Sequence, residues 1–509
     1  MRRTITDLLL VILSGSLTAL AFPKFNLFFL AWISLIPLLH VLSKRKPVSS
    51  FFLGLAAGSV FYAILLYWIP AVPAHYGSLS LPLSILIYLA LVLVLASLWA
   101  VFGFLFSAVN RSFPVLVFFI APFLWTSIEY IITYLFTGFP WGLIGYSQYK
   151  NIPLIQITTI TGVYGIAFVM VGFQSCFLLS MKSRTKSPFF AALTLVLLIH
   201  TAGFVHVKSI TPNQDSFSAS VIQGNVSSDI QWAKLSYQEI EDIFNRHLDL
   251  SRSAYQEGSR LIVWPEFSVP LCFSCPYGIY QEFKERLLHF VSTTECTLLL
   301  GTNEKSEFQG ETMYHNTALA LKPDHTRSLY YKIHLVPFGE YTPYKKIFAF
   351  ISSVAHAIGD LTPGKTHSLH AFKGIPFGSP ICYEIIFPDL VRRFTKNGAQ
   401  FLITITNDGW YGRSAAPFQH FSMAVLRAVE NQRYLLRAAT TGISGMIDPY
   451  GRILRRSELM TQTYLSETIT PVRKVTIYTK YGDILPYVCL TLTVIFLILA
   501  LVMRPNEKQ

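Results

Sequence analysis

The sequence predicts an α/β domain inserted into an all-α, polytopic membrane domain of eight transmembrane helices. Of the 509 residues, 52% are hydrophobic and only 14% are charged, whereas a soluble domain carries about 25% charged residues. The deficit is uneven, because residues 1–207 hold just two acidic residues, Asp7 and Glu129, while residues 216–480 have an ordinary globular composition. The chain therefore combines a membrane part with a soluble part large enough to bury its own core.

Eight apolar runs are long enough to be membrane spans, since about 20 helical residues cross the roughly 30 Å of hydrocarbon in a bilayer. The predicted domains are residues 1–210 with seven transmembrane helices, the soluble residues 215–470, and residues 482–504 with the eighth helix. We expect the spans near residues 5–22, 26–43, 51–70, 82–106, 113–136, 161–181, 188–207 and 484–503.

Basic residues in the short loops predict the orientation, because cytoplasmic loops carry an excess of Lys and Arg. Alternate loops, starting with the N-terminus, hold eleven basic residues, and the opposite short loops hold two, Lys24 and Lys150. This asymmetry places both termini in the cytoplasm and the soluble part outside. We therefore expect a multi-pass protein of the bacterial inner membrane whose soluble domain is periplasmic.

Two features of the membrane part have more than one interpretation. Arg2-Arg3, an apolar stretch and Ala19-Leu-Ala21 resemble a cleaved signal peptide, although cleavage would leave the side of the soluble domain unchanged. Glu129 lies inside the fifth span, where a carboxylate faces a bundle interior or a partner. A structural role and a position beside a lipid head group are both open for it.

The net charge and the cysteines exclude two classes of function. The net charge is +13, but the cations form no stripe with interleaved aromatic residues, so we expect no nucleic-acid partner. Cys176 and Cys489 lie in apolar spans, as packing residues do. Cys272 and Cys275 form a single C-x-x-C without the second pair or the histidines that a zinc site needs, and a disulfide between them is the open alternative. We expect no metal site.

Short buried strands alternate with helices in the soluble part, which predicts an α/β sheet with helices on its faces. Functional groups in such folds gather at the carboxyl ends of strands, and Glu266, Lys332, Cys382 and Asn407-Asp408 fall at such ends. We expect helices at 237–258, 283–293 and 419–437, and strands at 218–225, 260–265, 297–301, 316–321, 328–332, 377–382 and 401–406.

Three of these residues are the groups that acyl transfer through a thioester requires. Cys382 ends an apolar run, and its thiolate would be the nucleophile once a base or a cation assists its formation. Glu266 is the predicted general base, and Lys332 is the predicted stabiliser of the oxyanion. Each also has a plain structural alternative: a buried packing cysteine, a carboxylate after a Trp-Pro turn, and a solvated lysine at a strand end.

Residues 218–455 resemble the nitrilase superfamily, through Trp264-Pro-Glu266, Tyr330-Tyr-Lys332 and Ile381-Cys-Tyr-Glu384. The resemblance implies a four-layer α-β-β-α nitrilase-like sandwich with a Glu266–Lys332–Cys382 triad. Nearly the whole chain is similar to the apolipoprotein N-acyltransferase family. That similarity rests on the eight-span frame and on three further strings, Lys332–Tyr341, Val221–Asn225 and Asn407–Trp410.

The second resemblance implies an acyltransferase of the last step of bacterial lipoprotein maturation. Such an enzyme moves an acyl chain from a phospholipid to the α-amine of a lipoprotein's S-diacylglyceryl cysteine, by a ping-pong mechanism through a Cys382 thioester. The expected partners are the phospholipid donor, the diacylglyceryl-cysteine apolipoprotein acceptor and the bilayer, with no cofactor and with a monomeric protein.

The resemblance also implies supporting residues around the triad. Glu340, Glu384, Tyr383 and Phe338 are expected in the active site, although salt bridging in a loop is open for the two carboxylates. Three aromatic residues are expected at the substrate entrance, since amphipathic rings settle at membrane interfaces, and core packing is the alternative for each. These are Trp232, Trp410 and Tyr411.

Other functions stay open from sequence alone. The triad would also suit a membrane-tethered amidase or nitrilase-type hydrolase, and a transporter or scaffold that only binds a lipid would need none of the three groups. A different acyl acceptor is the third alternative. The long segment 341–364 with an apolar middle is predicted to be a lid that gates lipid access, because loops of this length in compact domains are often lids.

Overall fold

The computed structural model describes residues 2–77, 79–227, 234–269, 272–275, 280–344 and 361–503. The chain forms two compact units, which are described one at a time. The first comprises Met1–Pro70, Leu81–Lys208 and Tyr481–Gln509, and the second comprises Ala71–Ser80 and Ser209–Lys480. The short connection Ala71–Ser80, which contains helix α4 (Ala71–Tyr76), therefore belongs with the soluble residues although it joins two helices of the first unit.

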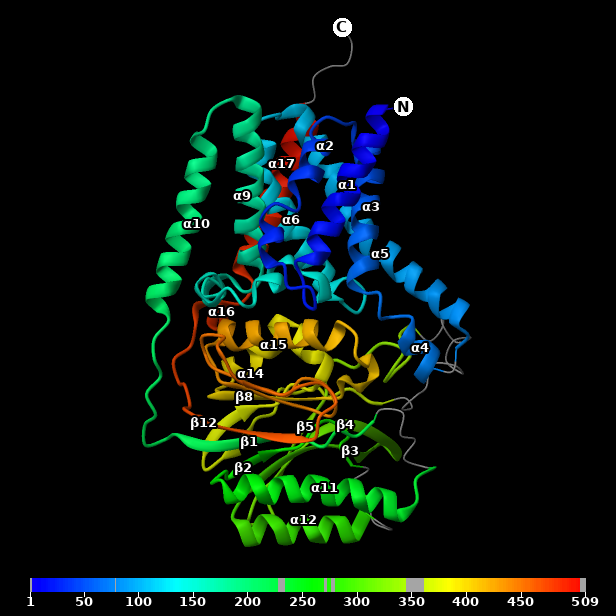
Figure 1. Ribbon diagram of the computed structural model, residues 1–509, viewed down its shortest axis with the longest axis vertical. Helices are drawn as coiled ribbons and strands as arrows, with labels where there is room; N and C mark the ends of the chain where they lie inside the picture. The colour runs from blue at the N-terminus through cyan, green and yellow to red at the C-terminus, as the bar shows by residue number, and fades with distance from the viewer. Residues whose placement is uncertain are drawn as a thin grey trace. The chain divides into compact units, whose positions relative to one another are not determined.

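The first unit is a bundle of helices (Figure 1). Seven helices in the described part of the chain are long and apolar enough to cross a membrane. Their bounds are α1 (Arg2–Leu20), α3 (Pro47–Leu65), α5 (Leu81–Ser112), α6 (Val117–Tyr134), α9 (Tyr164–Ser183), α10 (Ser187–His206) and α17 (Ile484–Val502). Shorter helices are α2 (Ile36–Leu42), α7 (Ile152–Ile155) and α8 (Thr158–Thr161), with 3-10 turns at Phe28–Trp32, Pro140–Gly142 and Ile144–Gln148.

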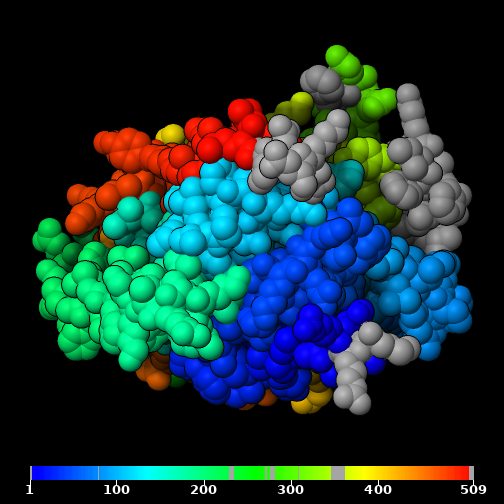
Figure 2. Space-filling model, turned by 90° about the horizontal axis from the view of Figure 1, so that it is seen from above, coloured from blue at the N-terminus to red at the C-terminus, as the bar shows by residue number. Residues whose placement is uncertain are grey.

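Helix α17 joins the N-terminal helices in one bundle although more than 270 residues separate it from α10. It packs on α6, where the hydroxyls of Ser127 and Thr493 lie 3.2 Å apart and the Tyr134 hydroxyl donates to Asp483 at 3.0 Å. Figure 2 shows α17 in red beside the cyan segment that includes α6. The beginning of α1 and the end of α17 lie at the same end of this unit (Figure 1).

The span expected near 26–43 is not one continuous helix, because this segment is a 3-10 turn followed by the seven-residue α2. Pro37 lies in the first turn of α2 and has no amide N–H to continue a helix. The Gln174 side chain accepts from the Leu35 N–H at 2.7 Å and donates to the Ala31 carbonyl at 3.1 Å. Such partners make broken helices tolerable inside a membrane bundle.

This broken segment still returns the chain to the end of the unit at which α1 begins. Arg45, which follows α2, forms an ion pair with Asp7 near the start of α1. The segment therefore runs the length of the unit without being one continuous helix, and the count of eight spans stays a prediction.

The second unit is a four-layer α-β-β-α sandwich (Figure 1). One outer face carries α14 (Pro388–Lys396) and α15 (Ala416–Asn431), and the other carries α11 (Tyr237–Gln256) and α12 (Tyr280–Thr294). One sheet has the order β12-β1-β2-β3-β4-β5 and the other β11-β10-β9-β8-β7-β6. The strand bounds are β1 (Phe217–Gln223), β2 (Leu261–Val263), β3 (Thr297–Phe308), β4 (Glu311–Leu321), β5 (Arg327–Tyr331), β6 (His370–Phe372), β7 (Ile375–Gly378), β8 (Phe401–Thr406), β9 (Leu435–Ala439), β10 (Gly445–Ile447), β11 (Ile453–Arg456) and β12 (Thr463–Ile469).

Aromatic side chains bind the layers together. Between the sheets, the Phe217 ring of β1 lies 4.6 Å from Phe372 and 5.3 Å from Phe401, measured between ring centroids. Under the first sheet, α11 (Tyr237–Gln256) and α12 (Tyr280–Thr294) join through Phe244 and Phe283, whose rings stack at 4.6 Å. Burial of such side chains stabilises the fold by about 1.5–3 kcal/mol each.

Gly378, at the end of β7, allows the outer helix α14 (Pro388–Lys396) to pack closely on the second sheet. A Cβ atom on Gly378 would lie 2.5 Å from the Cβ of Phe394, which no real pair of atoms tolerates. Gly378 therefore has a packing role four residues before the candidate nucleophile.

Two predicted boundaries in the second unit are wrong. Helix α15 (Ala416–Asn431) ends before the expected residue 437, because Gln432 adopts a left-handed conformation with φ of 49° and residues 435–439 pair as β9 with β8. The strand expected at 377–382 ends at Gly378, and Cys382 begins a 3-10 turn instead. The open question about Cys272 and Cys275 is also answered, since the two are joined by a disulfide.

Candidate active site

The two sheets bring the three candidate catalytic residues to the ends of their strands. Glu266 follows β2, Lys332 follows β5 directly, and Cys382 begins the 3-10 turn Cys382–Ile386 after β7. The three residues are 3%, 1% and 6% exposed, respectively. Lysine and glutamate are rarely buried to this degree unless they are paired, so the partners of Lys332 and Glu266 decide what the site can do.

Lys332 lies between two carboxylates. Its Nζ donates to Glu340 Oε1 at 2.9 Å and to Glu266 Oε1 at 3.3 Å. The Asn316 amide of β4 donates to the same two oxygens, at 2.7 Å and 2.8 Å. Glu266 Oε2 accepts the Asn407 backbone N–H at 2.8 Å, so this carboxylate is held from both sheets.

The charges around Lys332 keep its ammonium protonated. Burial alone would lower the pKa of Lys332, but Glu266 and Glu340 more than offset this and raise it above its ordinary value. Burial and the nearby Glu266 carboxylate raise the pKa of the Cys382 thiol, and Lys332 and the Thr406 hydroxyl oppose that rise. The resting sulfur is therefore a thiol, and a base must take its proton before it can attack.

Cys382 has a strained backbone. Its φ of 49° lies in the left-handed region, which costs an ordinary residue about 1–2 kcal/mol. Neighbouring contacts hold this conformation: Glu384 Oε2 accepts the Ile381 N–H at 2.7 Å, and the Cys382 carbonyl oxygen lies 3.2 Å from Nε2 of His420. Strain of this kind is found at functional sites that hold a group in place.

Glu384 joins the cysteine turn to the loop after Lys332. Its Oε1 accepts the Tyr330 hydroxyl at 2.7 Å and the backbone N–H groups of Ile333 and His334 at 2.7 Å and 3.0 Å. Burial raises the pKa of Glu384 to about 7, against the donors of Ile381, His334 and Tyr330, which lower it. Because the three backbone N–H groups in these contacts can only donate, the site favours a carboxylate on Glu384.

Glu384→Gln is therefore expected to destabilise the protein. Whichever way the glutamine amide is turned, its NH₂ faces at least one backbone N–H, so the free energy of unfolding should fall by about 1–3 kcal/mol. Thermal unfolding of the full chain in detergent, beside Glu257→Gln on the protein surface as a control, measures this. Equal unfolding temperatures for Glu384→Gln and the wild type would contradict the assignment of Glu384 as a carboxylate that accepts hydrogen bonds from both segments.

The remaining predicted site residues have different surroundings. Tyr383 is buried, with its ring 5.3 Å from Phe387, whereas Phe338 is 40% exposed at the tip of a turn. Tyr411 is half-buried, with its ring 6.5 Å from that of His420. Trp410 stacks edge-on at 4.5 Å against Tyr76 of α4, whose hydroxyl donates to the Gly409 carbonyl at 3.1 Å.

Two predictions fall outside the described residues. Trp232 lies in the undescribed stretch 228–233, and residues 345–360 of the predicted lid are likewise not described. The substrate role of Trp232 and the lid therefore stay predictions.

The sequence patterns place Asp408 at a strand end but do not identify Asn316, His420 or Arg437, three buried polar residues near the candidate site. Asn316 lies in the middle of an ordinary strand, and no motif distinguishes it. The partners of Asp408 are His420 and Arg437, which lie 12 and 29 residues further along the chain. Polar residues inside the long apolar stretches of α15 and β9 are the one signal that would have singled out His420 and Arg437.

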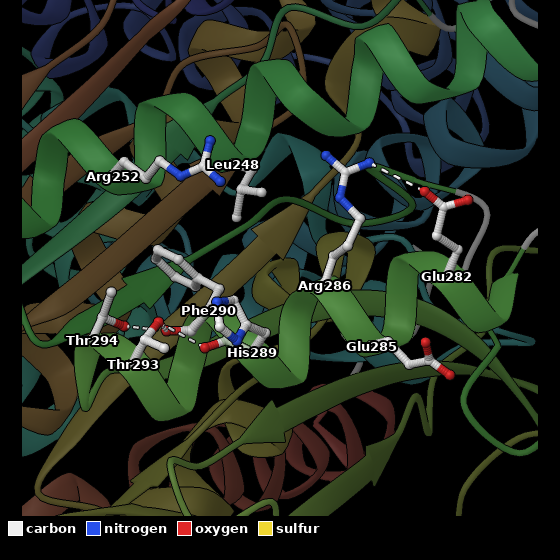
Figure 3. Close-up of a pocket in the computed structure, with 9 residues that line it drawn as sticks. All are labelled: Leu248, Arg252, Glu282, Glu285, Arg286, His289, Phe290, Thr293 and Thr294. Carbon is white, nitrogen blue, oxygen red and sulfur yellow. Dashed lines mark hydrogen bonds and ion pairs between the residues drawn. The ribbon is translucent and has the colours of Figure 1, made fainter.

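A surface pocket of about 590 Å³ lies between α11 and α12, on the outer helical layer (Figure 3). Arg252, Arg286, Glu282 and Glu285 surround it with charges of both signs. The predicted catalytic residues do not line this pocket, so it adds nothing to the cluster at the strand ends.

Two family models match the chain. Residues 14–176 match the apolipoprotein N-acyltransferase N-terminal domain, and residues 218–475 match carbon-nitrogen hydrolase. The apolipoprotein N-acyltransferase of Geobacter metallireducens is 37% identical over 496 residues, covering 95% of this chain and 93% of that protein. The chain belongs to the apolipoprotein N-acyltransferase family.

Other relatives extend the match across distant bacteria. The apolipoprotein N-acyltransferases of Thermotoga maritima and Coxiella burnetii are both 29% identical, over 97% and 91% of this chain. Among solved structures, an amidase of the nitrilase superfamily from Nesterenkonia is 18% identical, with a TM-score of 0.37 over 51% of this chain and 93% of that one. Members of the family thus match the membrane and soluble parts of this chain together.

Proposed function

We propose that this protein transfers an acyl chain from a phospholipid to the α-amine of an S-diacylglyceryl cysteine on apolipoproteins, through a thioester on Cys382. The observation that carries the proposal is the buried Cys382 thiol, with the buried Lys332–Glu266 pair at 3.3 Å, in a chain matched over 95% of its length by an apolipoprotein N-acyltransferase. Glu266, Lys332 and Cys382 are the proposed catalytic residues, and Glu340, Glu384, Tyr383 and Phe338 support them.

In the first half-reaction, the Cys382 sulfur attacks the ester carbonyl of the phospholipid while Glu266 takes the thiol proton. The resulting oxyanion is stabilised by the Lys332 ammonium, which is fixed by Glu340 and therefore needs no rearrangement. When the intermediate collapses, the ester C–O bond breaks, and Glu266 returns the proton to the leaving lysophospholipid oxygen. Cys382 is then a thioester.

In the second half-reaction, the α-amine of the diacylglyceryl cysteine attacks the thioester carbonyl. Glu266 takes a proton from the amine, the C–S bond breaks, and the proton returns to the Cys382 sulfur, so that the enzyme is restored and an amide is formed. Neither half-reaction needs a metal or a nucleotide, because one base and one fixed cation serve both.

The proposed setting is the inner membrane of a bacterium, with a periplasmic catalytic domain and cytoplasmic termini. Seven apolar helices and the bacterial relatives support a membrane protein. The common end at which α1 begins and α17 finishes (Figure 1) supports termini on one side. The proposed substrate entrance includes Trp232, Trp410 and Tyr411, and the proposed working form is a monomer.

The test is a transfer assay with the full-length protein in detergent. A phospholipid with a labelled acyl chain and a diacylglyceryl-cysteine peptide are the substrates, and the mass of the peptide is followed. The proposal expects the peptide to gain one acyl chain on its α-amine. Release of free fatty acid at an unchanged rate with and without peptide would instead identify a hydrolase, and no reaction of bound lipid would overturn the proposal.

A further inference from the structure

A second buried polar cluster lies directly behind the Cys382 turn. It consists of Asp408 after β8, His420 on α15 and Arg437 on β9, which are 1%, 0% and 0% exposed. Arg437 Nη2 donates to Asp408 Oδ2 at 2.7 Å, and its Nε donates to the Ile443 carbonyl at 3.1 Å. The catalytic roles proposed above use none of these side chains.

His420 connects this cluster to the nucleophile. Its Nε2 lies 3.2 Å from the carbonyl oxygen of Cys382, and its Nδ1 lies 2.9 Å from Asp408 Oδ1 and 3.0 Å from Arg437 Nη2. A carbonyl oxygen only accepts hydrogen bonds, so the proton of the first contact belongs to Nε2.

The protonation state of the ring does not alter that contact. In the neutral ring with its proton on Nε2, Nδ1 accepts from Arg437; in the charged ring, Nδ1–H donates to Asp408. Nε2–H donates to the Cys382 carbonyl in both forms. Asp408 and Arg437 therefore hold the ring in place from behind, whichever form is present.

We propose that His420 is a positioning residue for the nucleophile, which holds the strained backbone of Cys382 through its Nε2–H. The carbonyl that it binds belongs to the residue with φ of 49°. Because the peptide unit is planar, holding the carbonyl also sets the direction of the following Tyr383 N–H. His420 acts through Cys382 and does not touch the substrate.

Loss of the His420–Cys382 contact is expected to slow the acylation step without weakening substrate binding. A reacting atom displaced by about 1 Å can lose about 100-fold in rate. Loss of the Nε2–H contact releases a strained backbone that bears the sulfur, so the acylation step slows. The phospholipid contacts stay as they were, so KM is expected to stay unchanged.

Two substitutions of His420 distinguish the contact made by Nε2 from the contacts made by Nδ1. In His420→Gln the side-chain amide reaches about as far as Nε2 and can donate to Cys382. In His420→Asn the amide reaches only about as far as Nδ1, so it can contact Asp408 but not the Cys382 carbonyl. Both variants remove the ring, and they differ in the contact on which the proposal rests.

The experiment measures single-turnover acylation of Cys382 by phospholipid, followed by intact mass on the full-length protein. This readout rests on the proposed function. We expect kcat for acylation to fall about 10–100-fold in His420→Asn with KM unchanged, and to stay within about threefold of the wild type in His420→Gln. Equal acylation rates in His420→Asn and His420→Gln would overturn the proposal. A loss of rate that is fully explained by a smaller fraction of folded protein would overturn it too.

Two further measurements keep the outcome unambiguous. The control is His247, an equally buried histidine on α11 whose Nδ1 lies 2.9 Å from the Ile243 carbonyl. His247→Gln and His247→Asn should acylate at the same rate per folded protein. Alkylation of Cys382 by iodoacetamide, mapped by peptide mass, needs no lipid. If the wild type forms no acyl adduct, the proposed function fails. The alkylation result still tests the positioning role in that case: slower alkylation in His420→Asn than in His420→Gln supports it, and equal alkylation refutes it.

Discussion

Cys382→Ala is expected to abolish both acyl-enzyme formation and transfer, with a loss of about 10⁴-fold or more. Removal of a nucleophile leaves only binding and electrostatic stabilisation, and losses of this size follow in other enzymes with covalent intermediates. The fold should tolerate the change, because alanine at φ of 49° is strained no more than cysteine.

Intact mass after incubation with phospholipid, before and after hydroxylamine, measures the result. The wild type should carry a hydroxylamine-labile acyl adduct that the diacylglyceryl-cysteine peptide discharges, and Cys382→Ala should carry none. Cys296→Ala is the matched control, since Cys296 is also a free, buried cysteine, whose Sγ lies 3.5 Å from the Ser259 carbonyl. An adduct on Cys382→Ala, or its loss in Cys296→Ala, would refute the assignment of the nucleophile.

Lys332→Met is expected to lose about 10²–10³-fold in kcat and also to destabilise the protein. The loss in rate follows from removing the fixed cation at the developing oxyanion. The loss in stability follows because Nζ contacts both Glu266 and Glu340, each about 4% exposed at the side chain. Removing the shared cation leaves two buried carboxylates without a compensating charge, which costs about 3–5 kcal/mol.

The double variant Lys332→Met/Glu340→Gln separates these two effects. Replacing one carboxylate relieves the repulsion, so the unfolding temperature should recover part of the loss while the transfer rate stays low. Thermal unfolding and the peptide transfer assay on the same preparations measure both quantities. Recovery of activity together with stability would show that Lys332 holds the fold and takes no part in the chemistry.

Local sequence patterns were sufficient to predict many of the strands and apolar helices of this protein. The strands that end before Glu266, Lys332 and Asn407 were predicted close to their observed positions, because a run of apolar residues followed by a polar turn is a property of adjacent residues. The four-layer sandwich came from the family resemblance and is confirmed by the two facing sheets. Seven of the eight predicted spans correspond to long apolar helices for the same local reason.

The errors occur where distant residues decide the local structure. The break within 26–43 is stabilised by Gln174, which lies about 140 residues further along the chain, and no window of sequence contains both. The end of α15 is set by the pairing of residues 435–439 with β8, although Leu-Leu-Arg-Ala-Ala is an equally good helical sequence.

By itself, the sequence predicted an α/β domain within a membrane domain and the positions of the three proposed catalytic groups at strand ends, because composition, periodicity and short motifs are local; the family resemblance added the four-layer architecture. Only the tertiary structure decided how those groups are held. Pairing of β4 with β5 brings Asn316 beside Lys332, and pairing of β8 with β9 brings Arg437 to Asp408. Hydrogen bonds and charges act over a few ångströms in space, and separation along the chain does not limit them.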